Sequence, residues 1–156
     1  MQNLKISLIT TSYNSEITIS DTLSSVLLQS YSNIEYIIVD GGSSDETISI
    51  IKEYEPLFNG RLKWISEKDD GIYDAMNKGI QMASGDIVGI LNSDDLFFDS
   101  NVLGDIVQAF DSKIEAVCGN LYFVSLMIRI LLLGLGKEVL IIALIKVGIL
   151  HILHFT

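Results

Sequence analysis

Two adjacent acidic residues, Asp94 and Asp95, lie just beyond an apolar run of strand-forming residues at positions 87–91, after Asn92 and Ser93. Neighbouring carboxylates repel each other unless water or a cation lies between them. Carboxylate oxygens are hard ligands that suit Mg²⁺ or Mn²⁺, with phosphate oxygens and water completing the coordination. The pair is therefore a candidate site for a divalent metal, and a solvated acidic turn is the alternative.

Two other polar loops also follow apolar runs, Thr11–Asn14 and Asp40–Ser44. In the first, Tyr13 offers a flat face on which a nucleobase could stack. A half-buried loop tyrosine is the alternative. In the second, Asp40 could accept hydrogen bonds from a base or a ribose hydroxyl, although Asp-Gly-Gly is also a common turn sequence.

These loops need a scaffold that brings them together. Apolar runs predict strands, and stretches with helical periodicity alternate with them. The strands are expected at 4–10, 34–39, 61–66, 87–91 and near 116–117, and the helices around the apolar faces at 19–27, 48–54 and 72–83 and from about 101 to 110. This alternation is typical of an α/β fold with a mostly parallel sheet flanked by helices. Because parallel strands end at one edge of a sheet, the three loops should converge there.

Local signals refine the loops. Asn14 or Ser15 is the expected N-cap of the first helix, and Ser43 with Glu46 has the spacing of a capping box for the second. Glu67, Asp69 and Asp70 follow the third expected strand and could line the same edge. For Asp70, a place at the entry of the next helix is the favoured interpretation.

Composition excludes several classes of function. A chain of 156 residues, 49% hydrophobic and with a net charge of −10, has room for one packed domain but no basic face for nucleic acid. It contains neither the glycine fingerprint of a dinucleotide oxidoreductase nor a phosphate-binding P-loop. The single cysteine, Cys118, excludes an internal disulfide and is expected to be buried. The N-terminus lacks the apolar core of a secretory signal, which predicts a cytoplasmic protein.

Four ordered segments resemble the family 2 glycosyltransferases, which have the GT-A fold and use nucleotide-diphospho-sugars. The resemblance covers about residues 5–123. The segments are Thr11-Ser12-Tyr13-Asn14, Val39-Asp40-Gly41-Gly42-Ser43-Ser44-Asp45, Gly71-Ile72-Tyr73-Asp74-Ala75-Met76-Asn77-Lys78-Gly79 and Leu91-Asn92-Ser93-Asp94-Asp95. The last stands where the family carries its metal-binding DXD motif.

The resemblance implies a role for each matched position. Thr11, Tyr13 and Asp40 would hold the nucleobase. Asp94 would contact the ribose or share the metal, and Asp95 would be a metal ligand facing the diphosphate. Asn14 and Asp69 complete the candidate nucleotide-binding residues, which are Thr11, Tyr13, Asn14, Asp40, Asp69 and Asp94. Two positions depart from the family pattern: Asn92 replaces the first aspartate of DXD, and Asp70 replaces a frequent lysine.

The resemblance also implies a reaction. A divalent Mg²⁺ or Mn²⁺ would help a nucleotide-diphospho-sugar, most simply a UDP-sugar, transfer its sugar to a glycan or lipid-linked acceptor, with inversion at the anomeric carbon. Such enzymes of bacterial surface-polysaccharide synthesis would work in the cytoplasm or at the inner face of the membrane. The general base belongs to a later part of the domain, and we find no candidate for it in this chain.

Residues 124–156 differ in composition from the rest of the chain. They are rich in Ile and Leu and carry three basic residues against the single acid Glu138. We therefore expect a nucleotide-sugar-binding part at 1–123 and an anomalous tail at 124–156, arising from a frameshift or truncation or serving as a membrane-associating segment. Charges interrupt every stretch of the ~20 residues that a membrane span needs, which favours the frameshift. A non-catalytic nucleotide- or partner-binding module is the alternative function.

Overall fold

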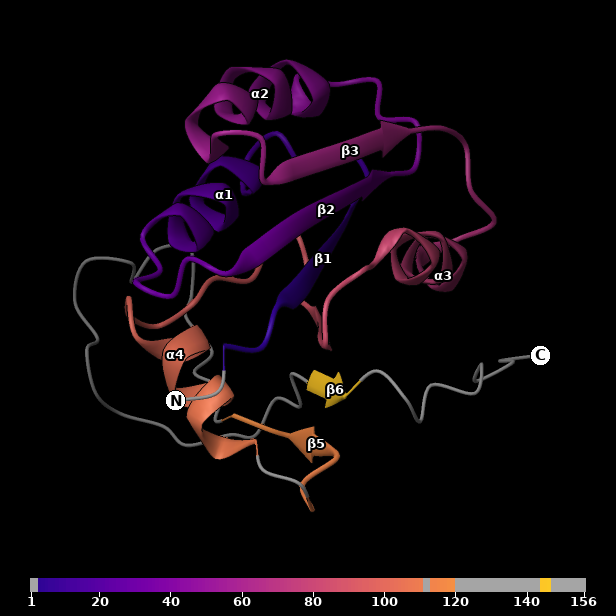
Figure 1. Cartoon of the computed structure of the whole chain (residues 1–156). Helices are drawn as coiled ribbons and strands as arrows, with labels where there is room; N and C mark the ends of the chain where they lie inside the picture. Colours follow the sequence, from indigo (N-terminus) through magenta and orange to yellow (C-terminus); the bar gives the residue numbers. More distant parts are fainter. Residues whose placement is uncertain (1–2, 111–112, 120–143, 147–156) are drawn as a thin grey trace, which may run out of the picture.

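A six-stranded sheet with helices on both faces forms the described part of the protein (Figure 1). The computed structural model describes residues 3–110, 113–119 and 144–146. The strands are β1 (Ile6–Ser12), β2 (Ile34–Asp40), β3 (Leu62–Ser66), β4 (Ile87–Ile90), β5 (Ala116–Val117) and β6 (Leu144–Lys146). The helices are α1 (Ile19–Leu27), α2 (Thr47–Tyr54), the short 3₁₀ helix η1 (Glu55–Phe58), α3 (Ile72–Met82) and α4 (Val102–Ala109).

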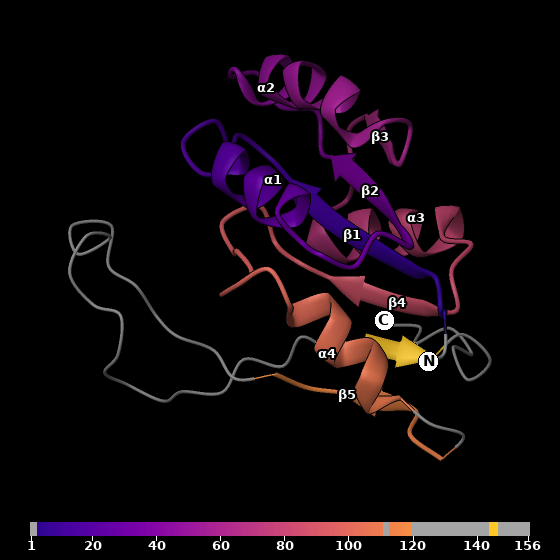
Figure 2. The same cartoon turned by 60° about the vertical axis from the view of Figure 1, so that its left-hand side comes forward.

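The sheet has the order β3-β2-β1-β4-β6-β5. The four strands from β3 to β4 are parallel, whereas β6 pairs antiparallel with both β4 and β5. This confirms the predicted α/β class with a mostly parallel sheet. Because β1 lies between β2 and β4, the loops that follow these three strands come out side by side at one edge (Figure 2).

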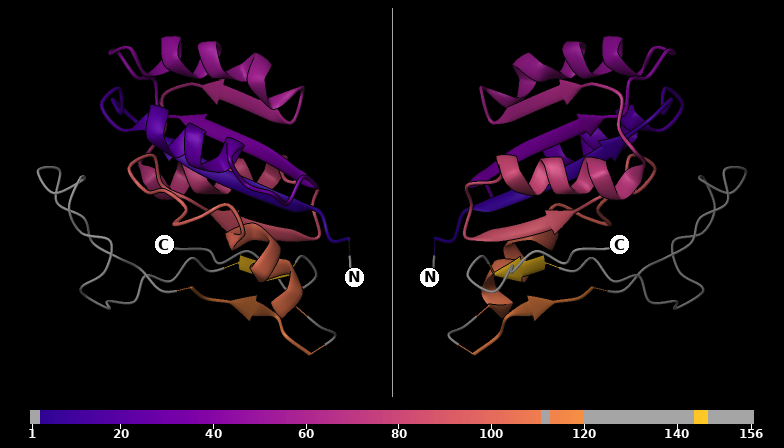
Figure 3. Two further views of the ribbon diagram at one scale, coloured as in Figure 1. Left: turned by 90° about the vertical axis from the view of Figure 1, so that its left-hand side faces the viewer. Right: turned by 90° about the vertical axis from the view of Figure 1, so that its right-hand side faces the viewer.

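The two faces of the sheet are covered by different helices (Figure 3). Every residue of β1 and β2 is buried, as expected for central strands of a parallel sheet. Leu8 and Tyr36 belong to a core shared with α1, α2 and α4, whereas Ile9 and Ile37 pack on the α3 side. A Cβ at Gly79 would lie 2.5 Å from the Ile9 side chain, so this glycine lets α3 approach β1 closely.

The amino-end edge of the sheet contains a buried acid, Glu35, only 4% exposed. Its carboxylate accepts hydrogen bonds from Ser7 Oγ at 2.5 Å and from the Ser84 backbone N–H at 2.6 Å, and pairs with Lys5 at 3.0 Å and Lys63 at 3.2 Å. Burial alone would raise the pKa of Glu35, but the hydrogen bonds from Ser7, Ser84 and Lys5 outweigh burial and hold the pKa well below its usual range. Glu35 thereby ties the starts of β1, β2 and β3 to the α3–β4 connection.

Several local expectations are corrected. Neither Asn14 nor Ser15 caps α1, whose N-cap is Thr18, without a side-chain hydrogen bond. The expected capping box is wrong too, because the Ser43 hydroxyl donates to Asp40 instead of capping α2. Asp40 offers an anionic acceptor close by, and this outcompetes the helix terminus.

Two more findings concern the C-terminal part of the chain. Cys118, expected to be buried, is exposed. Strand β6 was not predicted and falls within residues 124–156. The remainder of that segment lies outside the described residues, so its division from residues 1–123 stays a prediction. Within the described residues, no helix is long and apolar enough to cross a membrane.

Candidate functional site

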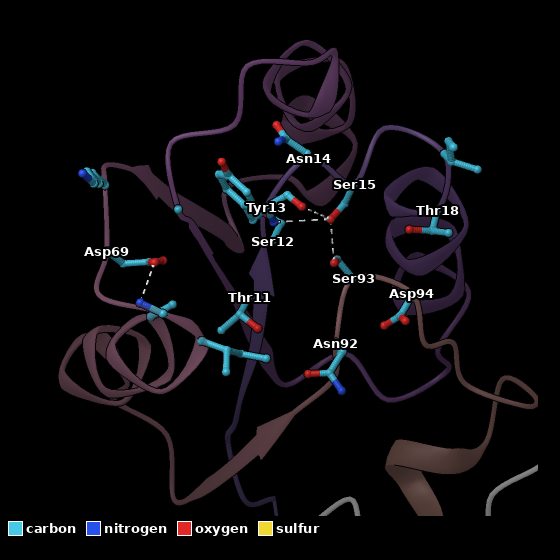
Figure 4. Close-up of a pocket in the computed structure, with 16 residues that line it drawn as sticks. Thr11, Ser12, Tyr13, Asn14, Ser15, Thr18, Asp69, Asn92, Ser93 and Asp94 are labelled. Atoms are coloured by element: carbon cyan, nitrogen blue, oxygen red, sulfur yellow. Dashed lines mark hydrogen bonds between the residues drawn. The ribbon is translucent and has the colours of Figure 1, made fainter. Parts of the chain in front are cut away.

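A pocket of about 1010 Å³ opens at the carboxyl-end edge of the parallel strands (Figure 4). Its wall is formed by the loops after β1 and β4, the start of α1, Gly41 and the segment that leads into α3. The lining residues are Thr11, Ser12, Tyr13, Asn14, Ser15, Ile17, Thr18, Gly41, Lys68, Asp69, Gly71, Ile72, Ala75, Asn92, Ser93 and Asp94. The lining includes five of the seven predicted site residues; Asp40 and Asp95 are not among them.

The two adjacent acids have different environments. Asp94 is exposed and lines the pocket, and no hydrogen bond or ion pair joins its carboxylate to any described residue. Asp95 is half-buried, and its Oδ2 accepts a hydrogen bond from Asn92 Nδ2 at 3.0 Å. Partial burial raises the pKa of the Asp95 carboxyl; the Asn92 hydrogen bond opposes that shift and the charge of Asp94 adds to it. Asp94 is therefore the acid open to a ligand.

Two buried polar atoms at the pocket lack a partner among the described residues. They are Thr11 Oγ1, on a residue that is 6% exposed, and Asn92 Oδ1. Figure 4 shows both side chains bordering the same space as Asp94. Buried polar atoms are nearly always hydrogen-bonded or bound to an ion or water, so unpartnered atoms in a pocket indicate that a ligand completes them.

The oxygens of Asn92 and Asp94 fit a hard cation. Amide and carboxylate oxygens are the ligand types that Mg²⁺ and Mn²⁺ prefer. Within the part of the chain that the structure describes, no group of three or more His, Cys, Asp or Glu residues could hold a metal ion. A cation at Asn92 and Asp94 would therefore need further oxygens from water or a phosphate group.

The first loop presents an aromatic face. Tyr13 lines the pocket with its side chain 65% exposed, so the ring is free to stack. Asn14 has a left-handed backbone conformation (φ 47°), which asparagine tolerates better than most residues. Its Oδ1 accepts a hydrogen bond from the Ser44 N–H at 2.9 Å, and its own N–H donates to Ser43 Oγ at 2.8 Å. Asn14 thus joins the first and second loops.

Asp40 has no exposed surface and no free acceptor site. Its carboxylate accepts five hydrogen bonds, from the N–H groups of Gly42 and Ser43 and the hydroxyls of Ser12, Ser43 and Ser66. A base could not bond to Asp40 without displacing one of these donors. The direct contact with the nucleotide would need such a displacement and stays a prediction; in this structure Asp40 ties the ends of β1, β2 and β3 together.

Asp69 lies against Gly41 at the pocket wall. A Cβ at Gly41 would fall 2.7 Å from Asp69 Oδ2, so the glycine leaves room for this carboxylate. Asp69 Oδ1 accepts a hydrogen bond from the N–H of Gly71 at 3.0 Å, at the start of α3. Asp69 Oδ2 accepts none from any described residue and remains free to accept one from a ligand.

The other acids of this segment lie elsewhere. Glu67 is exposed and pairs with Lys78 at 2.9 Å. Asp70 is exposed and lies off the pocket, as its favoured interpretation at the helix entry implies.

Sequence reasoning gave no site role to several pocket residues, among them Asn92, Lys68, Ser15 and Ser93. Lys68 lines the pocket and could contact a phosphate, but a lone lysine among acids gave no pattern. Ser15 and Ser93 join the first and third loops through their hydroxyls, 2.8 Å apart. Each is adjacent in sequence to a candidate residue, Ser15 to Asn14 and Ser93 to Asp94, which was the available signal.

Comparisons with known sequences identify relatives of this chain. The sequence model of the family described as "Glycosyl transferase family 2" matches residues 7–136. An uncharacterized glycosyltransferase of Mycobacterium tuberculosis is 41% identical over 109 residues, which are 69% of this chain and 40% of the relative. A PGL/p-HBAD biosynthesis glycosyltransferase of Mycobacterium bovis is 36% identical over 84 residues, 54% of this chain and 33% of that protein. The chain thus spans well under half the length of these relatives.

Solved structures of glycosyltransferases share the fold. A mannosyltransferase from Pyrobaculum calidifontis, in complex with GDP-Man and Mn²⁺, matches with a TM-score of 0.71 and 25% identity, over 76% of this chain and 36% of that one. Residues 1–349 of S. aureus TarS, in complex with UDP-GlcNAc, match with a TM-score of 0.60 and 28% identity, over 67% of this chain and 30% of that one. With a family match over most of its length, the chain belongs to the family 2 glycosyltransferases.

Proposed function

We propose that this chain binds the donor of a sugar-transfer reaction, a nucleotide-diphospho-sugar, together with a divalent cation. The observation that carries the proposal is the unpartnered Asp94 carboxylate beside the buried, unpartnered Asn92 Oδ1 in a large pocket. The buried, unpartnered acceptor costs the isolated protein free energy that a bound cation would recover, and the exposed Asp94 carboxylate supplies a negative charge to hold that cation.

Asp94 and Asn92 would hold the cation. When bound, Mg²⁺ or Mn²⁺ would neutralise the charge that develops on the leaving diphosphate. Asp95 acts one step back in this proposal, because its hydrogen bond with Asn92 orients the amide so that Oδ1 faces the pocket. From the sequence, Asp95 was expected to be the metal ligand that faces the diphosphate, whereas this proposal assigns the cation to Asp94.

The opposite side of the pocket would hold the nucleoside. Tyr13 offers its ring for stacking, and Thr11 Oγ1 and Asp69 Oδ2 offer hydrogen-bonding atoms that no described residue uses. A free carboxylate oxygen complements a base that carries a ring N–H, such as uracil or guanine. This favours a UDP-sugar, and a GDP-sugar is the next candidate; the solved relatives bind one of each kind.

The acceptor side of the reaction rests on the family. A glycan or lipid-linked acceptor, inversion at the anomeric carbon and work at the inner face of the membrane are proposals for the longer family members. Asp40, which is fully buried and saturated with hydrogen bonds, could not deprotonate an acceptor hydroxyl.

Calorimetry tests donor binding. UDP is titrated into the 156-residue chain with Mn²⁺, and again with the metal removed by a chelator. We expect saturable binding with Mn²⁺ and at least about a tenfold weaker affinity without it, because the cation held by Asp94 would offset the negative charge of the diphosphate. Absence of binding by UDP and GDP under both conditions would refute the proposal.

A non-catalytic nucleotide-binding module is the second candidate function. It is favoured by the carboxylates of the described site, because Asp40 is saturated with hydrogen bonds and Asp94 would hold the cation, which leaves neither as a general base. Donor binding without release of UDP in the presence of acceptor saccharides would support it, whereas measured sugar transfer would exclude it.

A further inference from the structure

Polar side chains of α1, and one just beyond its end, contact the backbone of the segment that carries Asp94. Thr22 and Ser25 are spaced by three residues, which places them on one side of α1, and Gln29 lies two positions after α1 ends at Leu27. All three bond to main-chain atoms between positions 93 and 103. Polar residues of a surface helix are normally exposed to solvent, yet Thr22 is fully buried and Ser25 is 9% exposed.

Thr22 contacts both neighbours of Asp94. Its hydroxyl oxygen lies 3.0 Å from the carbonyl oxygen of Ser93 and 2.8 Å from that of Asp95, so one O–H donor is shared between these two acceptors. The Asp95 N–H in turn donates to the Asn92 carbonyl at 3.1 Å, which closes the turn. The backbone is therefore fixed on either side of Asp94, while the Asp94 carboxylate itself remains without a partner among the described residues.

The contacts continue along the segment. Ser25 Oγ accepts a hydrogen bond from the Phe97 N–H at 3.3 Å. Gln29 uses both ends of its amide, with Nε2 donating to the Asp99 carbonyl at 2.6 Å and Oε1 accepting from the Leu103 N–H at 3.1 Å. Because each contact is to main-chain atoms, it fixes the path of the segment and leaves its side chains free for other tasks.

We infer that Thr22 is a positioning residue that sets the orientation of Asp94 toward the bound cation and diphosphate. The inference rests on the proposed donor-binding function. A buried valine has nearly the shape of threonine but cannot donate a hydrogen bond, so Thr22→Val would leave the carbonyls of Ser93 and Asp95 without this donor. The loop would then occupy several conformations, and the fraction that presents Asp94 correctly would fall.

The test compares Thr22→Val with Thr22→Ser, which keeps the hydroxyl, and with Ser24→Ala. Ser24 is the matched control, because its hydroxyl bonds to Ser20 and Tyr54 and to no atom of the segment at positions 93–103. Thr22→Ala is a second hydroxyl-free variant, for use if the valine variant does not fold. The affinity for UDP with Mn²⁺ is measured by calorimetry, and amide hydrogen exchange of residues 92–98 is measured in the metal-free full chain.

We expect Thr22→Val to weaken binding by about 10- to 100-fold, the usual range for a residue one step behind a ligand. Exchange at residues 92–98 should be faster. Thr22→Ser should recover both properties to within about threefold, and Ser24→Ala should change neither.

Unchanged exchange in both hydroxyl-free variants would overturn the inference, as would equal weakening of binding by Thr22→Ser. If the unmodified chain binds no donor, the proposed function fails and so does the link from Thr22 to the cation. Faster exchange in Thr22→Val would then show only that the hydroxyl holds the loop.

Discussion

Both edges of the parallel sheet carry an acid, but the two acids have opposite environments. At the amino-end edge, Glu35 is buried and its carboxylate bonds to hydroxyls, a backbone N–H and two lysines. At the carboxyl-end edge, Asp94 is exposed and its carboxylate contacts no described residue. An acid whose partners come from the protein stabilises the fold, and an acid without them is available to a ligand.

Asp40 distinguishes between two explanations for the role of an acid: its hydrogen-bond partners, or its position in the sheet. It lies at the same edge as Asp94, but it is buried and fully hydrogen-bonded like Glu35. If internal partners decide the role of an acid, Asp40 should behave in mutagenesis as Glu35 does. If location decides, it should behave as Asp94 does.

The largest expected effect on stability is at Glu35. Glu35→Gln removes the charge between Lys5 and Lys63 and turns one acceptor into a donor that faces other donors, which should lower the free energy of unfolding by about 3 kcal/mol. Urea denaturation measures this change. Glu53→Gln, at an exposed acid of α2, should stay within about 0.5 kcal/mol of the unmodified protein. A loss at Glu35 no larger than at Glu53 would remove the contrast between the two edges.

The pH dependence of stability tests the same comparison, because the depressed pKa of Glu35 predicts the direction in which its contribution changes with pH. The folded-state pKa of Glu35 is depressed, so its contribution is fully present above the unfolded pKa of about 4.3 and is lost as the pH falls toward the folded pKa. The difference in unfolding free energy between the unmodified protein and Glu35→Gln should therefore be constant from pH 7 to about pH 5 and shrink below about pH 4. A difference that grows on acidification would contradict this account.

Asp40→Asn tests whether partners or location decide. The amide would place a donor against the N–H and hydroxyl donors around Asp40, so we expect a loss of about 2 kcal/mol in unfolding free energy. Under conditions where the variant is folded, its affinity for UDP with Mn²⁺ should fall less than that of Asp94→Asn. Asp70→Asn, at an exposed acid, is the control. Unchanged stability with lost binding would return Asp40 to its predicted role as a direct nucleotide ligand.

Tyr13 should show the smallest of these effects and only in binding. Tyr13→Ala removes a ring that is 65% exposed, so stability should change little. Loss of a base-stacking ring typically costs about 1–3 kcal/mol, so UDP should bind about 5- to 150-fold more weakly in calorimetry. Tyr13→Phe keeps the ring and should bind normally. Equal affinities for all three proteins would place the base elsewhere.

The sequence was sufficient to predict the parallel strands of the sheet and the convergence of the loops, but not strand β6. Apolar runs such as Tyr36–Val39 have few structural alternatives, and their order predicts which loops meet. Tyr13 and Asp69 were expected at the site, and both line the pocket.

The partners of each acid could not be predicted, because they come from distant segments. Asp40 and Asp94 look alike in sequence, each an acid after an apolar strand. They differ because Ser12 and Ser66 reach one of them and no described residue reaches the other. The role of Thr22 was hidden for the same reason, since 71 positions separate it from Ser93.

The central claim is that Asp94 is the acid open to a cation and Asp95 is the acid that supports the loop. Its most direct test is a titration of Mn²⁺, followed by electron paramagnetic resonance in the presence of UDP, with the unmodified chain, Asp94→Asn and Asp95→Asn. We predict a loss of at least about 100-fold in Mn²⁺ affinity for Asp94→Asn and of about tenfold for Asp95→Asn, whose carboxyl acts through Asn92. Normal Mn²⁺ binding by Asp94→Asn, with binding lost in Asp95→Asn, would contradict the account.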